Sequence, residues 1–484
     1  MNQLHNRRRA GVLLHISSLP SGDLGQDAWL FVDLLESMGA SVWQTLPLNM
    51  THADGSPYQC LSAHAGNPDF ISFDALVADG WLAEADVSDP ESNRVSLLAK
   101  AYINFAQDKS AQKPFKHFCK SSAWLDDFSL FLVLRNQFQH AGWMHWPEAY
   151  KNRDALTIQS AKQRYASEIE VVKFTQYIFF KQWHALKVYA NSKQVSLFGD
   201  IPIFVAYDSA EVWAEPAMFK LDTDKNMTVV AGVPPDYFSA TGQRWGNPHY
   251  NWQAMQDNGF SWWLSRMHTQ NDLFDLVRID HFRGLEAAWE IPATEETAMI
   301  GEWVLAPGDA LLQAITEHFP NMTLIAEDLG IITDEVDALR EKYHLPGMKI
   351  LQFAFDGSPD NPYLPERITS NSVVYTGTHD NDTTLGWYLS MDESQRHPLH
   401  AYLHTEQPIM PQALIEMALA SESELAIIPM QDILLLDSSH RMNTPGTIEG
   451  NWQWRFDWEQ LQPEIIKWLS DTIKHTNRVQ HKLN

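Results

Sequence analysis

Short apolar runs alternate along the chain with stretches in which apolar residues recur at helical spacing. The runs are rich in β-branched residues, which is typical of buried strands. Eight runs stand out, at 10–16, 41–48, 195–206, 274–280, 322–330, 348–355, 372–382 and 425–436. Since helical patterns separate most of them, as at 25–39 and 309–319, they predict an α/β fold, a (β/α)8 TIM barrel. An open doubly wound sheet is the alternative, but no GxGxxG follows the first run.

The chain is much longer than a barrel requires. It has 484 residues, whereas a barrel needs about 250, so we expect one catalytic barrel over 1–484 with large insertions. The longest, 49–194 after the second strand, is mostly helical in pattern. The next, 207–260 after the third strand, is an aromatic loop segment rich in Gly and Pro. Because both follow strands, both should lie on the C-terminal face, where barrel active sites form.

Composition narrows the classes of partner. The net charge is −26, from 61 acidic and 35 basic residues. A surface this negative repels phosphate backbones and anionic lipid, so we expect no nucleic-acid and no membrane partner. The 19 Trp residues fit a large core, and some of them fit stacking platforms for sugar rings.

The cysteines and the N-terminus bear on location. Cys60 and Cys119 are the two cysteines, which is too few for a disulfide framework and lacks metal-ligand spacing. Basic residues precede an apolar patch near the N-terminus, but the patch is short and no small-residue cleavage site follows it. No run approaches the roughly 18 apolar residues of a membrane span. These features predict a cytoplasmic protein.

Three predicted strands end in acidic residues. The fourth ends at Asp280, the fifth at Glu327 and Asp328, and the seventh at His379 and Asp380. An Asp at a strand-to-helix junction often caps the next helix, and this alternative stays open for each residue by itself. Three such ends in one barrel instead place several carboxylates around one cavity.

Paired carboxylates suit the cleavage of a glycosidic bond. A retaining enzyme needs an ionised nucleophile and a protonated general acid. Arg278 shares a strand face with Asp280 and should favour its ionised form, as a nucleophile requires. Glu327 follows an apolar run without basic neighbours, which favours a protonated acid. Asp380, beside His379, could hold sugar hydroxyls.

Other chemistries lack their sequence patterns. The chain has no EF-hand loop. It also has no GxSxG turn and no P-loop. We therefore expect no metal and no cofactor.

Several longer motifs carry a resemblance. They are "SPYQ" (56–59), "GDIPIFVA", "GVPPDYFSATGQRWGNPHY", "RIDHFRG", "IAEDLG", "YTGTHDND" and "RMNTPGT" (441–447). In this order they resemble the amylomaltases, the 4-α-glucanotransferases of glycoside hydrolase family 77 in the α-amylase clan. The resemblance implies that Asp280 is the nucleophile, Glu327 the general acid/base and Asp380 the acid that stabilises the transition state. Asp200 matches a clan position of structural type.

The resemblance also implies a substrate groove. Arg278 and His379 match the clan's companions of the catalytic acids, and further matching positions would line the donor or acceptor sites. These further positions are Tyr58, Asp236, Gln243, Trp245, Asn247, His281, Asn381 and Asn443. The implied partners are malto-oligosaccharides, amylose and glucose, bound by a monomer or a homodimer.

The carboxylates alone do not separate transfer from hydrolysis, since both reactions share a glycosyl-enzyme intermediate. Transfer needs a held sugar acceptor and exclusion of water. The segment 232–250 and the helical insertion could supply that cover, which favours transfer of α-1,4-glucan segments. An α-1,4-glucan hydrolase is the alternative. A non-catalytic glucan-binding protein would lack one of the acids, and all three are present.

Overall fold

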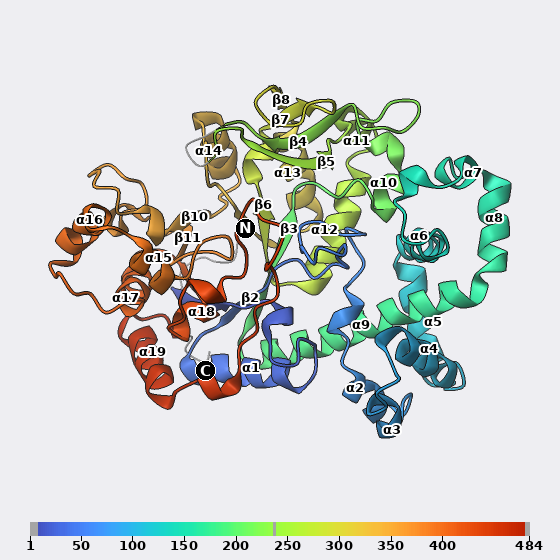
Figure 1. Cartoon of the computed structure of the whole chain (residues 1–484), viewed down its shortest axis with the longest axis horizontal. Coiled ribbons are helices and arrows are strands. Elements are labelled where there is room, and N and C mark those ends of the chain that lie inside the picture. The colour runs from blue at the N-terminus through green and yellow to red at the C-terminus, as the bar shows by residue number, and fades with distance from the viewer. Residues whose placement is uncertain (1–7, 236–238, 480–484) are drawn as a thin grey trace.

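A barrel of eight parallel strands forms the centre of the computed structural model, which describes residues 8–235 and 239–479 (Figure 1). The strands follow the order β10-β11-β12-β1-β2-β3-β6-β9. Each overlaps one of the apolar runs, so the predicted TIM barrel is confirmed. Their bounds are β1 (Arg9–Leu13), β2 (Val42–Gln44), β3 (Ser196–Pro202), β6 (Leu276–Asp280), β9 (Thr323–Ala326), β10 (Gly347–Ile350), β11 (Ser372–Tyr375) and β12 (Leu425–Pro429).

Two hydrogen bonds join β9 to β10 and bring the ends of the sheet together. The Ala326 amide donates to the Pro346 carbonyl over 2.9 Å. The Met348 amide donates to Asp328 Oδ1 over 2.6 Å. Asp328, one of the acids at the end of the fifth strand, thus closes the barrel and does not face the cavity.

Both faces of the barrel strands are buried, which explains why they read as continuous apolar runs. One cluster of buried side chains, drawn from all eight strands and including Phe198 and Tyr375, fills the interior. A larger cluster joins the outer faces to the surrounding helices. The predicted run at 425–436 ends early as a strand, since Pro429 has no N–H for the ladder, and α18 (Met430–Ile433) follows.

Most strands are followed by helices that cover the barrel. These are α1 (Gln26–Met38), α12 (Ser261–Leu273), α13 (Gly308–His318), α14 (Asp334–Lys342), α15 (Thr384–Ser390), α16 (Glu393–Leu403), α17 (Gln412–Ala420) and the closing α19 (Pro463–His475). Between β10 and β11 the chain instead makes two 3-10 turns, Leu351–Phe353 and Pro365–Arg367.

Helices fill the segment between β2 and β3, and most of them lie to one side of the barrel (Figure 1). The 27-residue α9 leads from them to β3. They are α2 (Phe73–Ala78), α3 (Glu84–Val87), α4 (Arg94–Phe105), α5 (Gln112–Ser121), α6 (Leu125–Gln137), α7 (Glu148–Lys151), α8 (Ala155–Arg164) and α9 (Ala166–Ser192).

A second, antiparallel sheet stands over the barrel with the order β5-β4-β7-β8. Its strands are β4 (Val229–Val233), β5 (Gln243–Pro248), β7 (Ala287–Pro292) and β8 (Glu302–Leu305), and α10 (Ala210–Ala214) and α11 (Trp252–Asp257) flank the first two. From the sequence, only a loop segment is expected at 207–260. β4 pairs with β5 and, on its other side, with β7, which follows β6 in the chain, so the sheet depends on a segment remote from this insertion.

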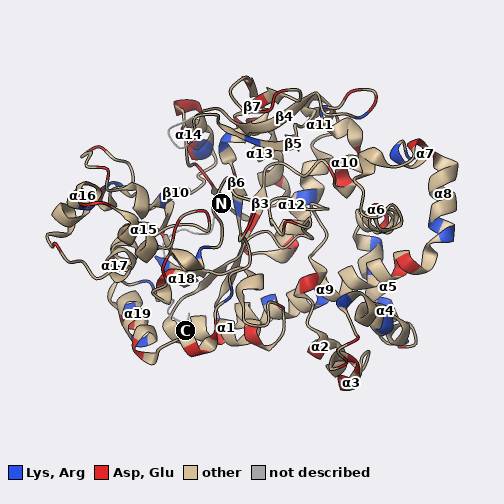
Figure 2. Cartoon of the chain, viewed as in Figure 1, with Lys and Arg blue, Asp and Glu red and all other residues tan. Residues whose placement is uncertain are grey.

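Charge and hydropathy of the elements fit the composition. Figure 2 shows acidic and basic segments interspersed over the barrel and the helical insertion. Within residues 8–235 and 239–479, no helix combines the length and apolar character needed to cross a membrane.

Candidate active site

A cavity of about 610 Å³ opens at the C-terminal ends of the barrel strands. Asp280 at the end of β6, Glu327 after β9 and Asp380 after β11 all line it. Parallel strands bring their carboxyl ends to the same rim. The structure therefore unites the three acids that the sequence placed at separate strand ends.

Arg278 ties Asp280 to the barrel. Its Nη2 donates to Asp280 Oδ1 over 2.7 Å, and its Nε donates to Asp200 Oδ1 over 2.9 Å. The Tyr58 hydroxyl donates to Asp200 Oδ2 over 2.7 Å and lies 2.9 Å from His379 Nε2. Arg278 and Asp200 are buried, so this network fixes the position of Asp280.

Glu327 is held by backbone donors. Its Oε2 accepts from the His281 amide over 2.7 Å, and its Oε1 accepts from the Leu329 amide over 3.0 Å. His281 directly follows Asp280 and has φ 52°, in the left-handed region. This turn of the backbone aims the His281 amide at Glu327, and the two catalytic candidates are thereby coupled in position.

Burial controls the protonation of both acids. It raises the pKa of Glu327 to about 7, against the opposing effect of Arg278 and of the two amides. Burial likewise raises the pKa of Asp280 well above its usual range, and the Arg278 charge only opposes this rise. The sequence predicted the rise for Glu327. It overestimated the effect of Arg278 on Asp280, because Asp200 shares that guanidinium and Glu327 adds a like charge.

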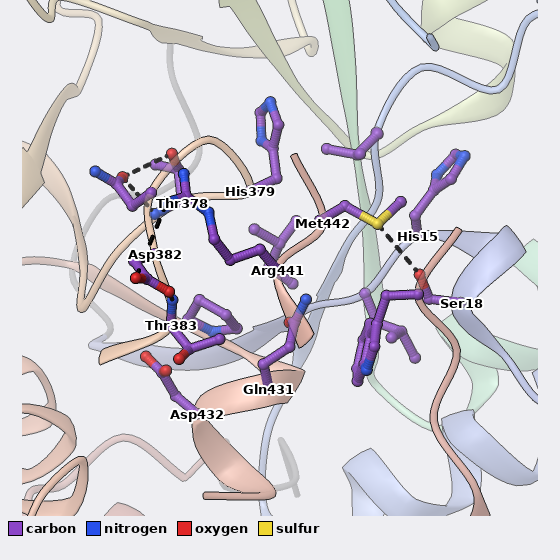
Figure 3. A pocket seen from close by; sticks show the side chains of 16 residues that line it. His15, Ser18, Thr378, His379, Asp382, Thr383, Gln431, Asp432, Arg441 and Met442 are labelled. Carbon is purple, nitrogen blue, oxygen red and sulfur yellow. Dashed lines mark hydrogen bonds and ion pairs between the residues drawn. The ribbon is translucent and has the colours of Figure 1, made fainter. Parts of the chain in front are cut away.

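Asp380 is the most exposed of the three acids and is held from a different direction. Asn443 Nδ2 donates to its Oδ1 over 2.6 Å, and Arg441 Nη2 donates to its backbone carbonyl over 3.0 Å. Figure 3 shows Arg441 beside the turn that carries Thr378 and Asp382, where it lines a small cavity of about 30 Å³. The segment after β12 therefore positions Asp380 on the turn after β11.

The antiparallel sheet supplies one wall of the large cavity. The Trp245 ring meets His281 edge-on, with ring centroids 4.8 Å apart, and Trp245 Nε1 donates to Gln243 Oε1 over 3.2 Å. Asn247 accepts from Gln59 Nε2 over 3.1 Å, which joins β5 to the segment after β2. The wall thus combines an aromatic face with amide groups, as sugar-binding cavities do.

Most of the predicted site residues line this one cavity. His379 contacts Tyr58 but lines the small cavity of Figure 3 instead, and Asp236 lies outside the described residues. The residues brought together are Tyr58, Gln243, Trp245, Asn247, Arg278, Asp280, His281, Glu327, Asp380, Asn381 and Asn443.

Four aromatic residues that line the cavity were not predicted from the sequence, Phe204, Trp303, Phe353 and Trp452. Trp452 packs against Tyr58 with ring centroids 6.0 Å apart, and Trp303 lies on β8 with its ring stacked against the guanidinium of Arg283. Trp452 follows the "RMNTPGT" motif closely, which could have drawn attention to it. Trp303 lies in a four-residue strand outside every quoted motif, so the sequence did not point to it.

The described residues contain no group of three or more His, Cys, Asp or Glu side chains placed to hold a metal ion. The expectation that no metal or cofactor takes part stays a prediction.

Comparisons with known proteins agree on a family. The 4-alpha-glucanotransferase family model, glycoside hydrolase family 77, matches residues 14–461. The 4-alpha-glucanotransferase of Thermus thermophilus is 45% identical over 98% of this chain and 99% of its own. That of Streptococcus pneumoniae is 41% identical over 99% of both chains. The solved amylomaltase from Streptococcus agalactiae in complex with acarbose has a TM-score of 0.94 at 36% identity, covering 98% of this chain and 100% of that one. With its barrel and its cavity of three acids, this chain belongs to the 4-alpha-glucanotransferase family.

Proposed function

We propose that this enzyme transfers α-1,4-glucan segments by a retaining double displacement, with Asp280 as nucleophile and Glu327 as general acid/base. The observation that carries the proposal is the coupling of these two carboxyls. The backbone amide of His281, next to Asp280, donates to Glu327, and both acids line one cavity. They can therefore act on the same glycosidic bond. A retaining mechanism requires such a close pair.

One proton shared by the pair resides on Glu327. Arg278 Nη2 donates to Asp280 Oδ1 over 2.7 Å, whereas the hydrogen bonds to the Glu327 carboxyl come, within the described residues, from two neutral backbone amides. The positive charge favours an ionised Asp280 once Glu327 is neutral, because the like-charge repulsion then disappears. Two buried acids thus take different roles, as acid/base pairs in glycoside-cleaving enzymes do.

The two steps follow from that assignment. In the first, an Asp280 carboxylate oxygen bonds to C1 of the donor sugar, the glycosidic C1–O bond breaks, and Glu327 gives its proton to the departing 4-oxygen. In the second, the 4-hydroxyl of an acceptor sugar bonds to C1, Glu327 takes its proton, and the bond to Asp280 breaks. Asp380, aligned by Asn443, holds hydroxyls of the reacting sugar as its ring flattens.

Transfer rather than hydrolysis requires that a sugar reach the intermediate before water does. The wall formed by Trp245 and its neighbours, together with Trp303 and Trp452, gives the cavity apolar surface on which an acceptor sugar can pack. The remaining substrate-binding assignments, including Tyr58, Gln243, Asn247, Asn381 and the undescribed Asp236, are part of the same proposal.

The proposed partners are malto-oligosaccharides, amylose and glucose. The acarbose bound to the Streptococcus agalactiae relative supports a glucan-like occupant. A cytoplasmic location and a monomeric or homodimeric state are likewise proposals, the former supported by the two unpaired cysteines.

The test is a time course of products from maltotriose. We expect glucose together with a ladder of oligosaccharides longer than maltotriose, and no ladder from Asp280→Asn. Asp275→Asn, five positions earlier at the opposite end of β6, is the matched control and should keep the ladder. Glucose without longer products would favour the hydrolase alternative, and a full ladder from Asp280→Asn would refute the assigned roles.

A further inference from the structure

An exposed apolar patch borders the catalytic cavity on the antiparallel sheet. It consists of Trp303 and Leu305 on β8 and Ile331 on the loop before α14. Their exposed fractions are 37%, 75% and 49%. β8 is the edge strand of its sheet and lies at the periphery of the molecule (Figure 1). An edge strand that exposes apolar side chains invites unwanted pairing, so such exposure calls for a functional reason.

The patch is continuous with the catalytic cavity. Trp303 and Ile331 themselves line the cavity. Leu305 lies two residues beyond Trp303 on the same strand, so both side chains project from the same face of the sheet. The apolar surface therefore extends outward from the cavity wall.

Arg283 holds the patch in place from below. Its guanidinium carbon lies 3.6 Å from the centroid of the Trp303 ring, and its Nη1 donates to the Ile331 carbonyl. Arg283 is buried, and it belongs to the turn that follows Asp280 in the chain. The turn after the nucleophile strand thus fixes both halves of the patch, which gives a preformed surface.

The position of the patch indicates which part of a substrate it would meet. Ile331 lies four residues after Glu327, on the loop that begins with the Leu329 amide bond to Glu327. Asp380, by contrast, is held from the segment after β12. The patch is therefore on the side of the general acid/base, where the leaving sugar departs and the acceptor enters.

We propose that the Trp303–Leu305–Ile331 patch binds the outer glucosyl units of a long acceptor glucan, beyond the unit that reacts. Sugar rings present apolar CH faces to aromatic and aliphatic side chains, and neutral hydroxyls tolerate the acidic surroundings. Three side chains are far too few for a stable protein interface, which buries about 800 Å² per partner. The patch would thus make the enzyme prefer long acceptors over glucose. This inference rests on the proposed function.

The test is a competition between two acceptors for one intermediate. α-Maltosyl fluoride serves as donor, and glucose and maltotetraose are supplied together at equal concentration. The donor carries an isotope label, and the initial formation of labelled maltotriose and labelled maltohexaose gives the partition ratio. This ratio does not depend on donor binding, because both labelled products arise from the same maltosyl-enzyme. We expect the wild type to favour maltohexaose.

Leu305→Ser is the decisive variant, because the side chain is exposed and its loss leaves the fold intact. It should lower the maltohexaose-to-maltotriose ratio about 4- to 15-fold, from the loss of one to two buried methylene-sized contacts. Trp303→Ala should lower it at least as much. Leu156→Ser, at a 76% exposed leucine of α8, is the matched control and should leave the ratio unchanged.

An unchanged ratio in Leu305→Ser, or an equal fall in Leu156→Ser, would overturn the inference. If the wild type forms neither product and releases only maltose, the transferase proposal itself fails and takes the patch inference with it. The two failures are therefore distinguishable in one experiment.

Discussion

Replacing Glu327 by Gln should make stability less sensitive to pH. The burial of Glu327 raises its pKa from 4.5 to about 7. The folded protein therefore binds this proton more tightly than the unfolded chain does. Below about pH 4.5 the carboxyl is neutral in both states. As the pH rises through 7, the folded state must carry a buried charge that the unfolded chain carries in water, and stability is lost.

The size of the effect follows from the same rise in pKa. At about 1.4 kcal/mol per pH unit, it corresponds to a loss of up to about 3 kcal/mol in the free energy of unfolding between pH 4.5 and pH 8. Glutamine has nearly the same shape and carries no charge, so Glu327→Gln avoids this loss. The substitution also removes the negative charge of Glu327 from beside Asp280. The pKa of Asp280 therefore falls, and its ionisation costs the folded state less at high pH.

The assay is the melting temperature at pH 5.5 and pH 8.5 for the wild type and the variant. The advantage of Glu327→Gln over the wild type should be larger at pH 8.5. Glu84→Gln, at an exposed glutamate of α3, is the control and should show no such change. If the difference between Glu327→Gln and the wild type is the same at both pH values, or is larger at pH 5.5, burial does not hold the proton on Glu327 and the reasoning is wrong.

Two further substitutions test how the other acids are held. Arg278→Ala leaves buried carboxylates without their counter-charge. It should lower the free energy of unfolding by about 3–5 kcal/mol, as measured by denaturant titration. A loss below about 1 kcal/mol would contradict the network seen around Asp280. Asn443→Ala removes the 2.6 Å hydrogen bond to Asp380. It should lower kcat/KM for maltotriose about 10- to 100-fold, as expected for a hydrogen bond to a charged group. Asn443→Asp should not restore the rate, because it places a second negative charge against Asp380.

The link between Asp280 and Glu327 depends on a single backbone turn. His281 adopts φ 52°, which directs its amide to Glu327 while its ring packs against Trp245. One residue therefore connects Asp280, Glu327 and the aromatic wall. Its ring Nε2 is buried and lacks a hydrogen-bond partner within the described residues.

The sequence by itself determined the barrel and the identity of its acids. Strands buried on both faces must be apolar throughout, so each strand appeared as a run, and acids at the ends of such runs must meet at one rim. The alternation of side chains along a strand also predicted that Arg278 lies beside Asp280, since residues two positions apart share a face.

Only the tertiary structure decided which charged groups surround each acid and which segments cover the cavity. Asp200 and Asp280 both bind Arg278, and the Arg278 charge also opposes the rise in the pKa of Glu327. Asp200 and Glu327 are both far from Arg278 in the chain. The antiparallel sheet joins the β4–β5 pair to the β7–β8 pair through the pairing of β4 with β7, which lie on either side of β6 in the chain. Trp303 lies on β8, which joins this sheet by pairing with β7, and lines the cavity from there. Hydrophobic periodicity records whether a side chain is buried, whereas protonation and substrate contact depend on which distant residues share the burial.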